Sequence, residues 1–156
     1  MFDFNCKWID YFRDHYFFLS NFYPSKFIVD DITFPTVEHF YQFKKISSYD
    51  DALSLLKEEN PGKVKKMTRS LPIKYGWDNI KKSVMNIGVY EKFNQNIELK
   101  NKLISTYPSY IMEGNMWHDN YWGHCLCDKC IKKNHYNVLG FILMKVRKEL
   151  NDNVSL

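Results

Sequence analysis

The chain has 156 residues, of which 45% are hydrophobic and 17% aromatic, so it is long and apolar enough to bury a core. We expect one domain over residues 1–156 with its core at about 10–150, and the absence of low-complexity tracts excludes a disordered chain. A net charge of +4 is too weak by itself to indicate a nucleic-acid coat. No apolar run approaches the roughly 20 residues of a spanning helix, and no signal peptide is apparent, so we expect a cytoplasmic protein with no membrane partner.

The first third of the chain predicts aromatic packing followed by a small β-hairpin. Residues 1–20 are rich in aromatic side chains, and we expect them to pack as an irregular or partly extended segment. Residues 20–24 form a polar turn that ends in proline and presents Asn21. Residues 26–29 and 32–34 flank two aspartates and predict a hairpin.

A helix is predicted over residues 36–46, with Thr36 as its N-cap. Glu38, Gln42 and Lys45 fall on one stripe of it, bordered by Tyr41, because positions i, i+4 and i+7 are neighbours on one face. The remaining arc is apolar and suited to burial, with Val37, Phe40, Phe43 and Ile46. The alternative interpretation of the polar stripe is an ordinary solvated face.

Five further helical segments follow, which together predict a mainly α-helical fold. They cover residues 49–58, 61 to just before Pro72, 77–94, 97–105 and 138–150. In the helix at 77–94 we expect Ile80, Val84 and Ile87 to face the core. The final helix carries one apolar stripe, formed by Leu139, Ile142, Leu143, Val146 and Leu150.

The helix that begins at Pro61 is strongly basic, with Lys63, Lys65, Lys66 and Arg69 close together. These side chains either form a solvated face or contact a phosphate group. Arg69 is the best candidate for phosphate binding, because its planar guanidinium suits an oxyanion.

Three separate stretches combine polar and aromatic side chains: residues 20–22, the stripe of helix 36–46, and residues 119–123. Taken singly, each is explained by a capped turn or a buried ring. Taken together, they supply the flat rings, amides and acids that a heterocycle attached to a sugar requires.

Three of the four cysteines, Cys125, Cys127 and Cys130, lie in one short stretch, and Cys6 stands apart. With His124 or His135 as a further ligand, the cluster has the residue types of a zinc site. A single C-x-x-C is a weak motif, and ordinary reduced thiols are the alternative.

In its order of motifs the chain resembles the NADAR family, also called the YbiA-like family. The resemblance covers nearly the whole chain, with Phe17–Phe22, Phe34–Gln42 with Lys45, Trp77-Asp78, Met85, Lys92–Asn96, Leu103, Thr106, Glu113, Asp119 with Trp122-Gly123, and Leu139–Arg147. Two stretches depart from the family pattern. His135 stands where the family usually has a glycine two residues before its asparagine, here Asn137. The family's glycine-rich stretch after Trp-Gly is here His124–Cys130.

The resemblance implies a single-domain, mainly α-helical YbiA-like orthogonal bundle with a small β-hairpin near its N-terminus. It also implies an N-glycosidase that requires no metal. Two substrates are associated with such proteins: phosphorylated ribosylamino-pyrimidine intermediates of riboflavin biosynthesis, and ADP-ribose attached to guanine in nucleic acid. Both reactions cut the bond between C1 of a ribose and an exocyclic nitrogen.

The residues at the matching positions fit this chemistry. Glu38 is the first catalytic candidate and Asp119 the second carboxylate, because C1–N cleavage builds positive charge on the sugar. Lys45 has two open roles: a nucleophile that forms a Schiff base with the ring-opened sugar, or a cationic clamp on a hydroxyl or phosphate. The substrate-binding candidates are Asn21, Tyr41, Gln42, Arg69, Trp77, Trp122 and Asn137.

Two non-enzymatic hypotheses compete with the glycosidase. One is a zinc-stapled module that binds nucleic acid through the basic stretch 63–69 and exposed aromatic rings, which predicts stoichiometric zinc and salt-dependent affinity. The other is a sensor that binds ADP-ribose or NAD without turnover. The presence of both acids and Lys45 argues against the sensor.

Overall fold

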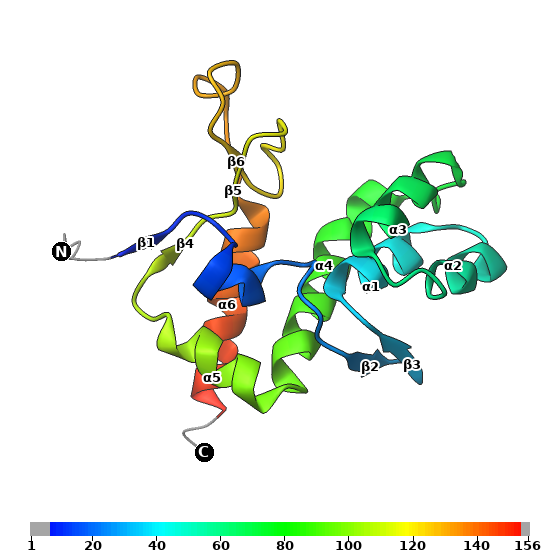
Figure 1. Cartoon of the computed structure of the whole chain (residues 1–156), viewed down its shortest axis with the longest axis horizontal. Helices are drawn as coiled ribbons and strands as arrows, with labels where there is room; N and C mark the ends of the chain where they lie inside the picture. Colours follow the sequence, from blue (N-terminus) through cyan, green and yellow to red (C-terminus); the bar gives the residue numbers. More distant parts are fainter. Residues whose placement is uncertain (1–6, 154–156) are drawn as a thin grey trace. The chain divides into compact units, whose positions relative to one another are not determined.

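A computed structural model describes residues 7–153 of the chain, and Figure 1 shows its mainly helical architecture. The predicted fold class, mainly α with a small hairpin, is confirmed. The contacts divide the chain into two compact units. One unit comprises residues 21–97, and the other comprises the chain up to residue 20 together with residues 98 onward. Each unit is described by itself below.

The unit of residues 21–97 begins with the predicted hairpin. Strands β2 (Phe27–Val29) and β3 (Ile32–Phe34) pair antiparallel, with Phe27 opposite Phe34. Asp30 and Asp31 form the connecting turn with φ angles of 51° and 61°. Aspartate is among the few residues that adopt this left-handed conformation readily, which explains why these two acids make a tight hairpin.

Helix α1 (Val37–Lys45) is the centre of this unit and packs against α2 (Tyr49–Leu55), α3 (Pro61–Met67) and α4 (Trp77–Asn94) (Figure 1). Thr36 is its N-cap, as predicted, and accepts a hydrogen bond from the His39 N–H. The predicted apolar face is buried in full. A Cβ atom at Gly88 of α4 would lie 2.7 Å from the Phe40 ring, so the glycine permits the close approach of α1 and α4.

The prediction for the buried face of α4 is wrong. Ile80 and Ile87 are exposed and Val84 is only partly buried. The buried positions are instead Trp77, Met85, Gly88, Val89, Lys92 and Phe93. A glycine and a lysine complete this stripe, and neither has the apolar character by which a core face is recognised in sequence. Helix α2 also ends at Leu55, three residues earlier than expected.

The other unit combines helices with short parallel strand pairs. Strand β1 (Trp8–Ile9) pairs with β4 (Tyr110–Ile111), and β5 (Gly114–Asn115) pairs with β6 (His124–Cys125). The helical elements are η1 (Asp14–Leu19), α5 (Ile97–Ser105), which enters this unit at residue 98, and α6 (Val138–Asp152). The predicted apolar stripe of α6 is buried throughout. Among the described residues, no helix is long and apolar enough to cross a bilayer.

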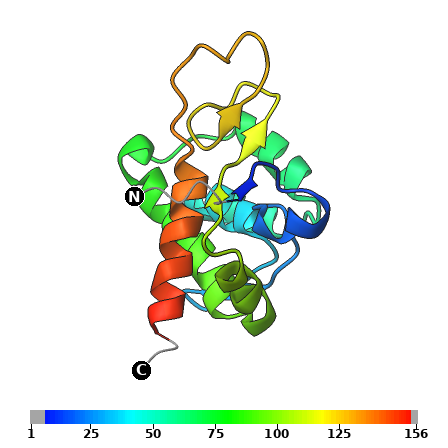
Figure 2. The same ribbon diagram turned by 90° about the vertical axis from the view of Figure 1, so that its left-hand side faces the viewer.

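Figure 2 shows β5 and β6 side by side at the end of α6 where that helix begins. The chain between β6 and α6 contains no helix or strand among its described residues 126–137. Cys6, which the sequence analysis sets apart from the cysteine cluster, lies outside the described residues, as do the first aromatic side chains of the N-terminal segment.

Candidate functional site

The polar stripe of α1 is buried, and it forms a hydrogen-bonded chain that ends at a carboxylate. Glu38 is 5% exposed and Gln42 3% exposed. The Gln42 Nε2 donates to Glu38 Oε1 at 2.8 Å, and the Gln42 Oε1 accepts from the Thr68 hydroxyl at 2.9 Å. The same hydroxyl lies 3.0 Å from the Lys65 carbonyl, so the two acceptors share its proton. This chain fixes the amide orientation and holds the carboxylate in one position.

Glu38 and Lys45 perturb each other within this buried environment. Burial raises the pKa of the Glu38 carboxyl above its ordinary 4.5, although Lys65, the Gln42 hydrogen bond and Lys45 oppose the shift. Burial likewise lowers the pKa of the Lys45 amine below its ordinary 10.5, against the attraction of Glu38. On both groups burial outweighs the mutual attraction. A carboxyl that is protonated more readily than an exposed glutamate therefore acts on an amine that is deprotonated more readily than an exposed lysine, which favours proton transfer and nucleophilic attack.

Tyr41 and Trp77 form an aromatic pair beside the stripe. Their ring centroids are 5.0 Å apart at an interplanar angle of 63°, and both side chains are largely buried. The structure thus brings together two of the three rings that the sequence proposes for the heterocycle, whereas Trp122 belongs to the other unit. A fixed edge-to-face pair offers a rigid wall of this kind.

Asn21 lies at the start of α1. Its carbonyl accepts the Glu38 N–H at 3.1 Å, and its side-chain amide donates to Met85 Sδ at 3.4 Å. The backbone of Asn21 therefore fixes the first turn that carries Glu38. Met85, which belongs to the resemblance motifs but not to the predicted site, orients the Asn21 side chain.

The basic stretch contributes to the site through a residue that sequence reasoning did not single out. Arg69 is exposed in the 3₁₀ turn η2 (Thr68–Ser70), which follows α3. Lys65, one turn earlier, is the cation that acts most strongly on Glu38. Thr68 was also missed, although its spacing of four from the buried Val64 places it on the inward face of this segment.

Asp119, Trp122 and Asn137 belong to the other unit. Asp119 Oδ1 accepts the N–H groups of Tyr121 and Trp122, at 3.1 and 2.9 Å, so this carboxylate closes its own turn. The rings of Tyr121 and Trp122 pack edge to face with centroids 4.9 Å apart. Within its unit, Asp119 thus positions the backbone of the Trp122 loop.

Asn137 precedes α6 and is buried with a left-handed φ of 46°. Its Oδ1 accepts the Glu113 N–H at 3.0 Å, and its Nδ2 donates to the Ile111 carbonyl at 2.9 Å. These bonds tie the start of α6 to β4. The Asn137 Nδ2 also donates to the Tyr110 hydroxyl at 3.3 Å, so the observed partners of this amide are two backbone groups and one side chain.

The cysteine cluster comes together in space, with a histidine that the sequence analysis did not name. The Sγ atoms of Cys125, Cys127 and Cys130 and the Nδ1 of His118 all lie within 4.8 Å of one another. His124 and His135 instead pack against each other, with ring centroids 3.7 Å apart. Within the described part of the chain, these four groups come together with the chemistry to hold a metal ion.

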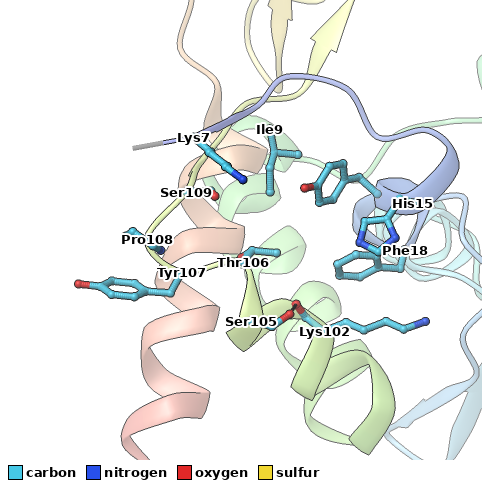
Figure 3. Close-up of a pocket in the computed structure, with 11 residues that line it drawn as sticks. Lys7, Ile9, His15, Phe18, Lys102, Ser105, Thr106, Tyr107, Pro108 and Ser109 are labelled. Atoms are coloured by element: carbon cyan, nitrogen blue, oxygen red, sulfur yellow. Dashed lines mark hydrogen bonds between the residues drawn. The ribbon is translucent and has the colours of Figure 1, made fainter. Parts of the chain in front are cut away.

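A pocket of about 420 Å³ opens within the unit that contains α5 and α6, and Figure 3 shows the side chains around it. It is lined by Ile9, by His15 and Phe18 of η1, and by the end of α5 with the segment that follows. None of the predicted site residues lines it, and no described residue in its lining is acidic. Because glycosidic cleavage depends on carboxylates, we place the candidate site at Glu38 and not in this pocket.

Comparisons with known proteins agree with this architecture. The NADAR domain family matches residues 9–151. The chain is 32% identical to the N-glycosidase YbiA of Escherichia coli K12 over 139 residues, covering 88% of this chain and 83% of the relative. It is 33% identical to the N-glycosidase Npun_R5314 of Nostoc punctiforme, covering 88% and 87%. The riboflavin biosynthesis protein VVA0006 of Vibrio vulnificus is 31% identical, over 87% of this chain and 36% of that longer protein.

The solution NMR structure of the E. coli protein YbiA superimposes with a TM-score of 0.81 at 30% identity, covering 95% of this chain and 88% of that structure. The mainly helical fold and the N-glycosidases among its relatives identify the chain as an enzyme of the N-glycosidase class. The chain belongs to the NADAR family.

Proposed function

We propose that this N-glycosidase hydrolyses the bond between C1 of a ribose and an exocyclic amine, in phosphorylated ribosylamino-pyrimidine intermediates of riboflavin biosynthesis. The observation that carries the proposal is the buried Glu38 carboxylate, held by Gln42 and Thr68, with Lys45 at lowered pKa beside it on α1. Support for the substrate comes from relatives that are named as riboflavin biosynthesis proteins, in Vibrio vulnificus and in maize chloroplasts.

Glu38 is proposed to stabilise the positive charge that develops at C1 and to take a proton from the attacking nucleophile. Its buried position strengthens this interaction, because a charge in a low-dielectric site is poorly screened. Its raised pKa makes it a better base than an exposed glutamate near neutral pH. Gln42 fixes the carboxylate, and Tyr41 with Trp77 would form the wall against the pyrimidine ring.

Lys45 is proposed as the nucleophile. When the ribosylamine opens to an imine, the neutral Lys45 amine adds to C1 and forms a C–N bond. The exocyclic amine then takes a proton and leaves, so that C1 becomes a Schiff base with Lys45. Water adds to this Schiff base and releases ribose 5-phosphate as the free aldehyde sugar, which restores the lysine. The overall reaction consumes one water and forms one amine.

The direct test is to incubate the purified protein with 5-amino-6-(5-phosphoribosylamino)uracil and to measure the release of ribose 5-phosphate. A parallel reaction contains guanine-ADP-ribosylated DNA, with release of ADP-ribose as its readout. We expect turnover of the small intermediate. Turnover of the DNA alone would overturn the proposed substrate in favour of nucleic-acid repair. If both substrates stay intact, the enzymatic proposal fails and a binding module takes its place.

A further inference from the structure

We propose that His118, Cys125, Cys127 and Cys130 form a structural zinc site that fixes the loop carrying Asp119 and Trp122. The four side chains offer one imidazole nitrogen and three sulfurs, a combination typical of closed zinc sites. The inference concerns the architecture of the loop, so it does not depend on the proposed substrate.

Four of the six distances between these atoms lie within about 0.4 Å of the edges of a tetrahedron around zinc. Zn–S bonds of about 2.3 Å and a Zn–N bond of about 2.0–2.1 Å place the sulfurs about 3.8 Å apart and the nitrogen about 3.6 Å from each sulfur. His118 Nδ1 lies 3.3 Å from the Sγ of Cys130, 3.3 Å from that of Cys127 and 4.0 Å from that of Cys125. The Sγ atoms of Cys125 and Cys127 are 3.4 Å apart, far beyond a disulfide bond.

Hydrogen bonds between the Asn115 side chain and the backbone build the histidine side of the site. Asn115 Oδ1 accepts the N–H groups of Trp117 and Asp119, and Asn115 Nδ2 donates to the Asp119 carbonyl at 2.7 Å. These bonds fold the turn that carries His118, whose φ is 68°. A left-handed conformation is uncommon at a non-glycine residue, and His118 adopts it at the point where its imidazole faces the cysteines.

The cysteine side is also tied to Asn115. Residue 125 is paired with Asn115 in the β5–β6 register, and the Cys125 N–H also donates to Asn120 Oδ1 at 3.2 Å. The Cys127 carbonyl accepts the N–H groups of Cys130 and Ile131, at 2.9 and 3.1 Å. This tight turn brings Cys127 and Cys130 together. The turn that carries His118 and the turn at residues 127–130 thus converge on one point.

The geometry selects His118 over the two histidines that the sequence suggests. The rings of His124 and His135 pack edge to face, and His135 Nε2 lies 3.1 Å from the Lys133 carbonyl. His118 precedes Cys125 by seven residues, which is too far for a compact spacing motif. The turn that the Asn115 side chain folds places the His118 imidazole beside the cysteines.

The loop is held by turns and hydrogen bonds and not by regular secondary structure. Among the described residues, 126–137 contain no helix or strand, and Met116, Trp117, Ile131 and Tyr136 are exposed. Three thiolates with one Zn²⁺ leave a charge of −1, which the exposed Lys129, Lys132 and Lys133 of the same loop can balance. With four protein ligands the metal has no open position, so its role is to hold the loop.

The test is the metal content of the full chain, purified without chelator, together with its Co²⁺-reconstituted form. We expect one zinc per chain, and for Co²⁺ the intense visible bands of tetrahedral coordination with a thiolate charge-transfer band in the near ultraviolet. Removal of the metal should make residues 115–137 the first site of limited proteolysis. Less than a tenth of an equivalent of zinc, with a Co²⁺ spectrum lacking thiolate bands, would overturn the site.

Matched histidine variants test the ligand assignment. His118→Ala should weaken zinc binding by more than about tenfold, since even the loss of a residue that only supports a ligand costs about that much. His124→Ala and His135→Ala should bind zinc as tightly as the wild type. His118→Cys, which restores a fourth ligand, should retain zinc and thereby show that the alanine variant failed for lack of a ligand. Unchanged affinity in His118→Ala with a loss in His124→Ala or His135→Ala would overturn the assignment.

Discussion

At the scale of single residues, burial shifts the pKa values of Glu38 and Lys45 in opposite directions, and each shift favours the proposed reaction. Glu38 holds protons more tightly than an exposed glutamate, and Lys45 holds them less tightly than an exposed lysine. The consequence is a pH dependence that nearby charges should be able to tune.

Lys65→Met should move the acidic limb of the activity profile to higher pH. Lys65 is the charge that most favours the ionised form of Glu38, so its removal raises the pKa of that carboxyl further. Lys66→Met is the matched control, because it removes the same charge from an exposed neighbour on α3 that is not among the main groups shifting the Glu38 pKa. The measurement is kcat/KM against pH at low ionic strength. Identical profiles for the two variants and the wild type would contradict the electrostatic coupling.

Borohydride should trap the Schiff base on Lys45. Reduction during turnover is expected to add a ribose phosphate to the peptide that contains this lysine, as measured by mass spectrometry. The Lys45→Arg variant should give no adduct, because a guanidinium does not form an imine. Lys44→Arg is the control, since Lys44 pairs with Asp30 at 2.6 Å. Turnover without any adduct would instead assign Lys45 the role of a cationic clamp.

At the scale of elements, α1 carries Glu38, Gln42 and Lys45. Hydrogen bonds at its N-terminus stabilise this helix. Thr36 Oγ1 accepts the His39 N–H and lies 2.8 Å from the His39 Nδ1, while His39 Nε2 lies 2.8 Å from the Glu58 carbonyl. Because a carbonyl only accepts, Nε2 carries a proton, and in the neutral ring Nδ1 accepts from the threonine hydroxyl. One side chain thus satisfies the helix start and a buried imidazole.

Thr36→Val should therefore destabilise the protein by about 1–3 kcal/mol, since it leaves both His39 groups without this partner. The comparison is Ser48→Ala at the cap of α2, where the serine accepts only the Asp51 N–H at 3.3 Å and the site is partly exposed. Urea denaturation of both variants measures the difference. A smaller loss in Thr36→Val than in Ser48→Ala would contradict the dual role of the cap.

The elements also show what sequence could and could not predict. Caps and spacing identified α1, α3, α5 and the hairpin, because Thr36, Asn60 and the two aspartates act through local geometry. The buried face of α4 was not predictable, since Gly88 and Lys92 enter the core through their contacts with other elements. For the same reason Thr68 and His118 were missed, because each reaches its partners only through tertiary folding.

At the scale of the whole molecule, one buried charge stands out from the catalytic stripe. Lys92 of α4 is fully buried, and burial lowers the pKa of its amine to about 7. Its Nζ lies 5.5 Å from the Tyr23 ring centroid and 5.0 Å from that of Phe93. Between pH 10.5 and about 7 the unfolded chain binds a proton that the folded chain does not. The free energy of unfolding must therefore fall as the pH falls through this window.

Lys92→Met should flatten this pH dependence and raise the free energy of unfolding at pH 6 by an amount on the order of a few kcal/mol, offset in part by the lost ring contacts. Chemical denaturation between pH 6 and pH 10 measures both effects. Lys82→Met, at an exposed position of the same helix, should leave the slope unchanged. If the slope also persisted in Lys92→Met, the buried amine would not be its source.

The central claim is that Glu38 performs the chemistry of an N-glycosidase, and the most direct measurement is the turnover number of Glu38→Gln on 5-amino-6-(5-phosphoribosylamino)uracil. Glutamine keeps the size of the side chain but neither the charge nor the basicity. We predict a loss of about 10²–10⁴-fold in kcat, as is typical for a general base, with thermal unfolding that shows a folded protein. The exposed Glu98→Gln should retain the wild-type rate. A folded Glu38→Gln with near-normal turnover would contradict the account.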